Sequence, residues 1–175
     1  TAGTLSAWKD GGVVILNDSS GNEVAGMGVT ENGGMLRLYD SSGGMAAAML
    51  AFGYGGSVIL NDSSGNEVAG MGAFEHGGSF RLVGSSGNVA AFMAATEDGA
   101  VFELSDNSGN TVADMKGAEN HGLFRLWGSS GKPVAMMGAL DGGAVSVHDS
   151  SGETAAFMMA TENGGVLRII NDSGK

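Results

Sequence analysis

The feature that most constrains this chain is a repeat of 22 residues. The clearest copies are residues 11–28 (GGVVILNDSSGNEVAGMG) and 55–72 (GGSVILNDSSGNEVAGMG), which differ only at Val13 and Ser57. A fixed period of this length is the signature of a repeat architecture rather than of a conventional globular domain. We expect a single repeat domain over residues 1–175, with repeats at 1–21, 22–43, 44–65, 66–87, 88–109, 110–131, 132–152 and 153–174.

The phase of the repeats is set by a turn of the type Asp-Ser-Ser-Gly. We number each repeat so that the glycine ending this turn is position 22, as at Gly21 and Gly43. One residue is missing from the seventh repeat, before Asp141. The chain starts at position 2 with Thr1 and stops at position 1 with Lys175, so we expect that a neighbouring copy could continue the array without a break in phase.

Each repeat contains two apolar alternations with a period of two, which is typical of strands with one buried face. In the first, alanine stands at position 4 and methionine at position 6, except that the first repeat has Gly3 and Leu5 there. In the second, apolar residues stand at positions 15 and 17. These alternations predict an inward-facing core ladder formed by Ala25, Met27, Ala47, Met49, Ala69, Met71, Ala91, Met93, Ala113, Met115, Ala135, Met137, Ala156, Met158, Leu36, Leu38, Leu60, Leu82, Leu104 and Leu126.

Two clusters of turn residues separate the strands, one around position 22 and one of the type Glu-Asn-Gly-Gly at residues 31–34. Gly and Asn tolerate a positive φ, and Asp or Ser side chains accept hydrogen bonds from nearby amides. The sequence therefore predicts an all-β fold, and we favour a β-solenoid of eight 22-residue strand-turn-strand-turn coils. An antiparallel meander in a trimeric fibre and a four-bladed propeller remain as alternatives, because local patterning fits all three.

Position 16 carries a second, 44-residue alternation, since arginine occurs there in every other repeat and never in adjacent repeats. Equivalent positions in a solenoid lie about 4.8 Å apart, where two cations would repel each other and Arg125 would attract Glu103. We therefore predict an alternating surface ladder of Arg37, Arg81, Glu103, Arg125 and Arg168. This alternation is the main reason for favouring the solenoid.

The layout of about 22 residues per coil resembles that of curli-type secreted fibre subunits, which are extracellular structural proteins. The Asp-x-x-Gly turns look like those of secreted bacterial and phage β-repeat fibre proteins. These resemblances imply a structural protein at an extracellular, cell-surface or virion-surface location.

Composition excludes several functions. The chain has no Cys, so disulfides and thiolate metal sites are impossible. A formal net charge of −11 disfavours nucleic acid as a partner. The longest strongly apolar run, residues 45–52, is too short to span a bilayer, which needs about 20 residues. The three histidines occupy different repeat positions, and no nucleophile motif is present, so we expect no enzyme activity and no cofactor.

Two binding hypotheses follow from residues outside the core ladder. A row of turn aspartates could bind Ca²⁺, but we favour the interpretation that each caps its own turn; these are Asp18, Asp40, Asp62, Asp106 and Asp149. Outward aromatic residues could form lateral contacts or stack on a glycan; these are Tyr39, Phe92, Trp127 and Phe157.

The function predicted from the sequence is that of a non-enzymatic structural protein. We expect it to be a subunit of an extracellular fibre that self-assembles by end-to-end stacking of β-coils, with itself as partner. The alternative is a glycan- or receptor-binding adhesin or lectin, including a trimeric fibre shaft or a propeller.

Overall fold

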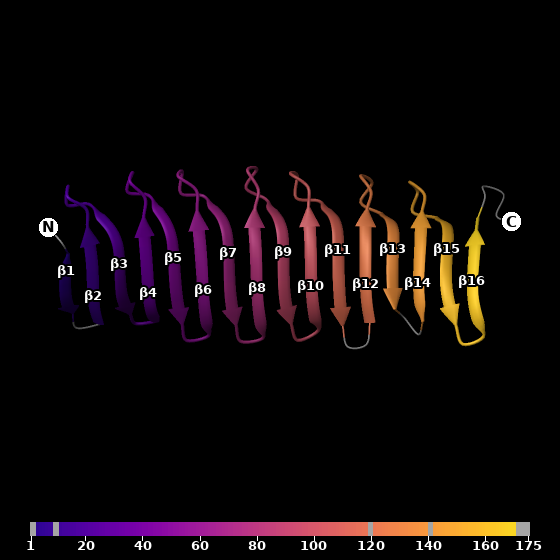
Figure 1. Ribbon diagram of the computed structural model, residues 1–175, viewed down its shortest axis with the longest axis horizontal. Helices are drawn as coiled ribbons and strands as arrows, with labels where there is room; N and C mark the ends of the chain where they lie inside the picture. Colours follow the sequence, from indigo (N-terminus) through magenta and orange to yellow (C-terminus); the bar gives the residue numbers. More distant parts are fainter. Residues whose placement is uncertain (1–2, 9–10, 119–120, 140–141, 171–175) are drawn as a thin grey trace. The chain divides into compact units, whose positions relative to one another are not determined.

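The computed structural model describes residues 3–8, 11–118, 121–139 and 142–170. The chain divides into two compact units, Thr1–Gly87 and Asn88–Lys175, and the division falls at the boundary between two repeats. Every described element is a β-strand, and every described strand pairing is antiparallel (Figure 1). The expectation of an all-β fold is confirmed.

In its described residues the first unit contains eight strands, and each is paired with the next strand of the unit. The strands are β1 (Thr4–Trp8), β2 (Gly11–Asn17), β3 (Glu23–Thr30), β4 (Gly33–Tyr39), β5 (Met45–Phe52), β6 (Gly55–Asn61), β7 (Glu67–Phe74) and β8 (Gly77–Val83).

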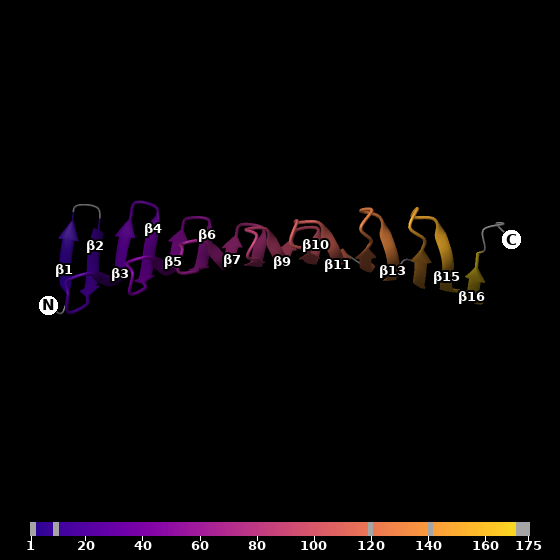
Figure 2. The same ribbon diagram turned by 90° about the horizontal axis from the view of Figure 1, so that it is seen from above.

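The second unit repeats this arrangement with another eight strands. They are β9 (Val89–Thr96), β10 (Gly99–Ser105), β11 (Thr111–Ala118), β12 (His121–Trp127), β13 (Pro133–Ala139), β14 (Gly143–His148), β15 (Thr154–Thr161) and β16 (Gly164–Ile169). Figure 2 shows that the strands of each unit form a single layer.

The topology of each unit is therefore an antiparallel meander, one of the alternatives considered above. The favoured solenoid would require each strand to pair in parallel with its equivalent in the next repeat, and the structure does not show this pairing. The propeller would require separate four-stranded blades, whereas pairing continues unbroken through β1–β8 and through β9–β16. The sequence-based preference for the solenoid was wrong in the pairing of the strands.

The physical reason lies in the turns, which are tight enough to reverse the chain. At one end of the strands, Gly21 donates its amide to the carbonyl of Asp18 at 3.1 Å, and Asp18 donates its amide to Asn22 at 2.9 Å. At the other end, only two residues separate the paired Thr30 and Gly33. Such short connections join antiparallel strands, while parallel strands need a long crossover.

A glycine is required at the shorter turns because the neighbouring strand passes close to the backbone. Gly55 has φ of +148°, and a Cβ built there would overlap the carbonyl oxygen of Ala73 on β7. The longer turns need glycine for another reason, since Gly65 has φ of +84° in otherwise open space.

Candidate functional surfaces

The alternation of residues along the strands gives each unit two chemically different faces. Ala25 lies opposite Leu16 and Leu38, and Met27 lies opposite Val14 and Leu36, so these residues share one face. We call the face formed by positions 4, 6, 8, 13, 15 and 17 of the repeats the methionine face. The face formed by positions 5, 7, 14, 16 and 18 is the arginine face.

All residues of the predicted core ladder lie on the methionine face, as the alternation predicts. In the structure this face lies open to solvent. The seven methionines at position 6 have exposed fractions between 52% and 56%, and the six ladder leucines have exposed fractions between 37% and 46%. A dry core formed by this ladder stays a prediction that requires a partner surface.

The energetic consequence of this exposure is large. Fully burying a methionine or leucine side chain is worth about 1.5–3 kcal/mol, so half-exposed side chains forgo roughly 1 kcal/mol each. The forgone stabilisation accumulates, because every repeat from the second onward adds one methionine at position 6 and two bulky aliphatic or aromatic side chains at positions 15 and 17 to this face. A single unit therefore presents a continuous apolar surface rather than a few isolated exposed residues.

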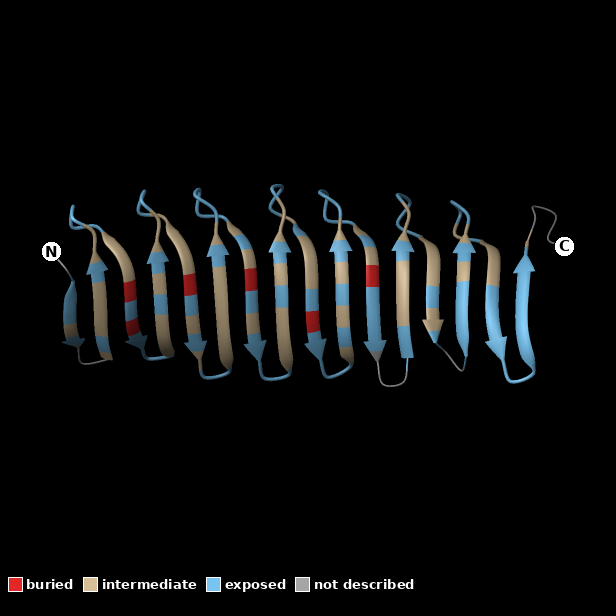
Figure 3. Cartoon of the chain, viewed as in Figure 1, coloured by how far each residue is buried: buried red, intermediate tan, exposed pale blue. Residues whose placement is uncertain are grey.

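The buried positions of the described chain all lie on the arginine face. They occur on β3, β5, β7, β9 and β11 (Figure 3). Their side chains are short at all positions but one, and the flanking strands carry longer side chains that fold over them. The buried residues are Gly26, Gly28, Ala48, Gly70, Ala94 and Asp114.

Asp114 is the centre of a polar cluster on the arginine face of the second unit. Its residue exposure is 2%, and it accepts hydrogen bonds from Arg125 Nε at 3.0 Å and Arg125 Nη2 at 2.7 Å. Trp127 Nε1 donates to the same carboxylate at 2.7 Å, and Lys116 Nζ lies 3.9 Å away. The Arg125 guanidinium also lies 4.8 Å from the centroid of the Trp127 ring. Both carboxylate oxygens of Asp114 are therefore satisfied by hydrogen bonds.

The protonation of Asp114 reflects two opposed effects. Burial raises the pKa of this carboxyl, but hydrogen bonds from Arg125 and Trp127 and the charges of Arg125 and Lys116 outweigh it. The net result is a pKa below the usual value for aspartate. Asp114 is accordingly an anion that binds the Arg125 side chain through two parallel hydrogen bonds, which is the strongest geometry for such a pair.

The first unit contains a related ion pair, in which the carboxylate comes from position 2 of the repeat instead of position 5. Glu67 and Arg81 form a bidentate pair, with Nε to Oε1 at 2.6 Å and Nη2 to Oε2 at 2.8 Å. The hydrogen bond from Arg81 lowers the pKa of Glu67. One atom of each residue at the equivalent positions, Glu23 Oε1 and Arg37 Nε, is buried without a hydrogen-bond partner.

The residues of the predicted surface ladder lie on the arginine face, but successive ladder positions do not lie on adjacent strands. Position 16 lies on alternate strands, so an intervening strand separates Glu103 on β10 from Arg125 on β12. Asp114 occupies that strand and takes the Arg125 side chain, while Glu103 accepts a hydrogen bond from Thr111 at 3.0 Å. Arg81 and Arg125 therefore pair with carboxylates on neighbouring strands instead of attracting a ladder residue directly. Arg37 and Arg168 occupy the same repeat position on β4 and β16.

The four aromatic residues proposed for lateral or ligand contacts all lie on the arginine face. Phe92 is opposite Glu103, and Phe157 is opposite Arg168. Trp127 belongs to the Asp114 cluster, whereas Tyr39 lies beneath Arg37, whose guanidinium is 5.9 Å from the ring centroid. The structure thus distributes these residues over several strands and does not gather them into one site.

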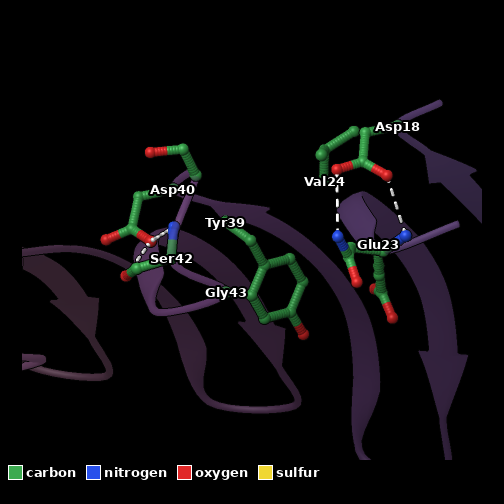
Figure 4. A pocket seen from close by; sticks show the side chains of 9 residues that line it. Asp18, Glu23, Val24, Tyr39, Asp40, Ser42 and Gly43 are labelled. Carbon is green, nitrogen blue, oxygen red and sulfur yellow. Dashed lines mark hydrogen bonds between the residues drawn. The ribbon is translucent and has the colours of Figure 1, made fainter. Parts of the chain in front are cut away.

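Tyr39 lines a pocket of about 320 Å³ in the first unit. The pocket lies between two neighbouring turns, with Asp18 on one side of the ring and Asp40 on the other (Figure 4). Glu23 also lines it. The pocket combines one aromatic ring with three carboxyl groups, which is a combination that the sequence did not reveal because these residues come from two repeats.

The turn aspartates cap their own turns, as the favoured interpretation predicts. In the first such turn, Asp18 Oδ1 accepts hydrogen bonds from the amides of Ser20 at 2.8 Å and Asn22 at 2.9 Å. Hydrogen bonds of this kind lower the pKa of each turn carboxyl. The same two amide contacts recur at Asp40, Asp62, Asp106 and Asp149.

Two other kinds of site are absent from the part of the chain that the structure describes. Within the described ranges, no group of three or more His, Asp or Glu side chains is placed to hold a metal ion. None of the described elements is a helix capable of crossing a bilayer. Thr1, Lys175 and the deletion before Asp141, which entered the predictions about the ends and the phase, lie outside the described residues.

The Asp114 cluster was missed by the sequence reasoning, although a signal for it exists. Position 5 is otherwise occupied by Thr, Gly, Ala, Phe or Met in the described repeats, and Asp114 is the charged exception. Arg125 lies at position 16 of the same repeat, directly opposite Asp114 in the hairpin.

No protein-family model matches the chain, and a search of curated proteins found no match.

Proposed function

We propose that this protein is a non-enzymatic structural protein, a subunit of an extracellular fibre formed by self-association. The observation that carries this proposal is the methionine face, on which every repeat from the second onward presents a half-exposed methionine beside other exposed apolar side chains. Contiguous apolar patches of this extent mark interaction surfaces. A cell-surface or virion-surface location fits the resemblance to secreted fibre proteins.

A repeated surface suits a structural role better than a catalytic one. Each repeat adds two strands and one more copy of the same contact residues, so contact area grows in proportion to repeat number. Catalysis requires dissimilar groups that converge on one point. The polar clusters of the arginine face instead have their partners within the sheet, as the Asp114 and Glu67 clusters do. The net charge of −11 also makes nucleic acid and anionic membranes unfavourable partners.

Electron microscopy of the purified full chain tests this proposal directly. We expect elongated assemblies at micromolar concentration and physiological salt, in preparations free of denaturant. Particles that stay dispersed and unconnected over a range of concentrations would contradict the fibre proposal.

The Tyr39 pocket favours a second candidate, a glycan-binding adhesin. Sugars are recognised by stacking on an aromatic ring and by donating hydroxyl hydrogen bonds to carboxylates, and Tyr39, Asp18, Glu23 and Asp40 supply both elements. Binding to a glycan array should then be lost in Tyr39→Ala. Val83→Ala, at the same repeat position two repeats later, is the matched control and should leave binding unchanged. Failure of the native chain to bind any glycan would dismiss this candidate.

A further inference from the structure

We infer that the methionine face is the docking surface for a second copy of this chain, packed face against face. This inference rests on the proposed self-association and specifies the surface that performs it. It assigns the arginine face to the exterior of the assembly. Three independent features of the structure support a copy of the same chain as the occupant: area, period and charge.

The first feature is the amount of surface left uncovered. The chain has an accessible surface of 11,696 Å². A compact folded monomer of 17.4 kDa would expose about 7,900 Å². A stable interface of standard size takes about 800 Å² from each partner. The excess is several times larger than that, so the chain has ample surface for an extensive interface between copies.

The second feature is the period of the surface. Within a unit, the methionines of successive repeats lie two strands apart, for example Met49 on β5 and Met71 on β7. This spacing is roughly 10 Å, since neighbouring strands are about 4.8 Å apart. A second copy presents its own methionines and leucines with the same spacing, so that side chains interdigitate at every repeat. A partner without this period would fit at one repeat and clash or leave voids at the next.

The third feature is the distribution of charge over the two faces. In the described strands, positions 4, 6, 8, 13, 15 and 17 contain only Ala, Gly, Met, Val, Leu, Ile and Phe from Gly11 onward. Interface cores are depleted of charged residues in the same way. Two copies with net charge −11 would repel through most surfaces, but face-to-face packing joins the surfaces that carry no charge.

The arginine face is unsuited to the same role because its side chains already cover it. Gly70 lies beneath the Glu67–Arg81 pair, and Asp114 is enclosed by Arg125 and Trp127. Docking on this face would displace those pairs or bury them further, which costs desolvation energy. The methionine face offers burial without breaking any hydrogen bond described above.

The first arm of the test compares two charge pairs on opposite faces of the same unit. Met49→Glu with Met71→Glu places two carboxylates on the methionine face, and Ser57→Glu with Ser79→Glu places two on the arginine face. Sedimentation of the full chain should show an oligomer for the native protein and for the serine variant. The association constant of the methionine variant should be lower by a factor of roughly 100 or more, because each interface would bury unpaired carboxylates. Equal association of both variants would overturn the inference.

The second arm uses the native chain, so it stays informative when the methionine variant does not fold. Limited oxidation by hydrogen peroxide followed by mass spectrometry reports the solvent access of each methionine. In the free chain the position-6 methionines are more exposed than Met159 of the arginine face, at 52–56% against 39%. In the assembly we expect the reverse order, with Met159 oxidised several-fold faster. Position-6 methionines that stay the faster group, or a chain that is monomeric at all concentrations, would contradict the inference.

These measurements separate the inference from the proposed function. Oligomers that protect the methionine face but never elongate would uphold the docking surface and refute the fibre. Fibres in which the position-6 methionines remain fully reactive would uphold the fibre and refute this docking surface.

Discussion

The arginine face and the methionine face alternate residue by residue along the same strands, yet among the described residues only the arginine face contains buried positions. On the arginine face, long side chains flank short ones: Gly70 lies between Ile59 and Arg81. On the methionine face, bulky residues flank a bulky residue: Met71 lies between Val58 and Phe80. Long side chains can fold over a glycine, but they cannot cover one another.

This difference shows how a single-layer sheet can obtain part of its stability from one face and leave the other for a partner. Isolated sheets in water normally need a second layer to bury one face. On the arginine face, long side chains lie beside short ones and arginines lie beside carboxylates, so residues are buried within the single layer. The following predictions, measured in the dissociated chain, test this contrast from the largest expected effect to the smallest.

The strongest contrast is expected between two neighbours on β11. Asp114→Ala leaves Arg125 and Trp127 Nε1 without their partner and should destabilise the chain by about 3 kcal/mol, as is usual for breaking a buried pair. Met115→Ala, the next residue on the opposite face and 53% exposed, should cost less than about 1 kcal/mol. Denaturant unfolding followed by circular dichroism measures both. Equal losses would remove the distinction between the faces.

A second pair of neighbours tests the same contrast by adding volume instead of removing it. A Cβ at Gly70 would lie 2.6 Å from Glu67 Oε1 and 3.4 Å from Arg81 Nε, so Gly70→Val should displace this ion pair. We expect a loss of about 1–2 kcal/mol in unfolding free energy, which is typical of overpacking. Ala69→Val adds its methyl groups to the open face and should change stability by less than about 0.5 kcal/mol. A tolerated Gly70→Val would mean that the arginine face is not closely covered.

The contribution of a single hydrogen bond on the arginine face can be measured with Trp127. Trp127→Phe removes the donor to Asp114 Oδ1 and weakens the contact with the Arg125 guanidinium. The expected loss is about 1 kcal/mol in unfolding free energy. Tyr39→Phe keeps the ring beneath Arg37 and should leave stability unchanged. A larger loss of unfolding free energy for Tyr39→Phe than for Trp127→Phe would contradict this prediction.

Much of this fold could be predicted because its signals are local. Alternation at positions 4, 6, 15 and 17 assigned Met27 and Leu36 to the core ladder, and in the structure they lie directly opposite each other on one face of the sheet. The turn chemistry was also readable, since Asp18 caps its own turn through amides two and four residues ahead. Both features depend only on residues within one repeat.

The pairing direction could not be predicted because it depends on how repeats meet. A parallel solenoid and an antiparallel meander need the same alternation and similar turn residues. The absence of arginine from adjacent repeats at position 16 was interpreted as avoidance of repulsion at about 4.8 Å, but the meander already separates Arg125 from Glu103 by a strand. The Tyr39 pocket and the Asp114 cluster likewise depend on contacts between strands that become neighbours only after folding.

The smallest effect is expected from acid, and it separates the faces by their chemistry. The pKa of Asp114 is lowered in the folded chain, and hydrogen bonds lower the pKa of Glu67 and the turn carboxyls such as Asp62. A depressed folded-state pKa contributes stability that is present above the unfolded-state pKa and is lost as pH falls through the folded-state value. Melting temperature should therefore be flat from pH 7 to about 5 and fall below about pH 4.

Two amide variants locate this acid sensitivity. Asp114→Asn removes the charge that Arg125 binds, so the fall of melting temperature in acid should become smaller in this variant than in Asp62→Asn. Asp62→Asn keeps an oxygen that can still cap an exposed turn. The methionine face carries no titratable group from Gly11 through the described strands, so association through it should not change between pH 7 and 5. Sedimentation across that interval checks this point. An oligomer that dissociates there while the fold stays intact would place the interface beside a group that titrates in this interval, and therefore outside the methionine face.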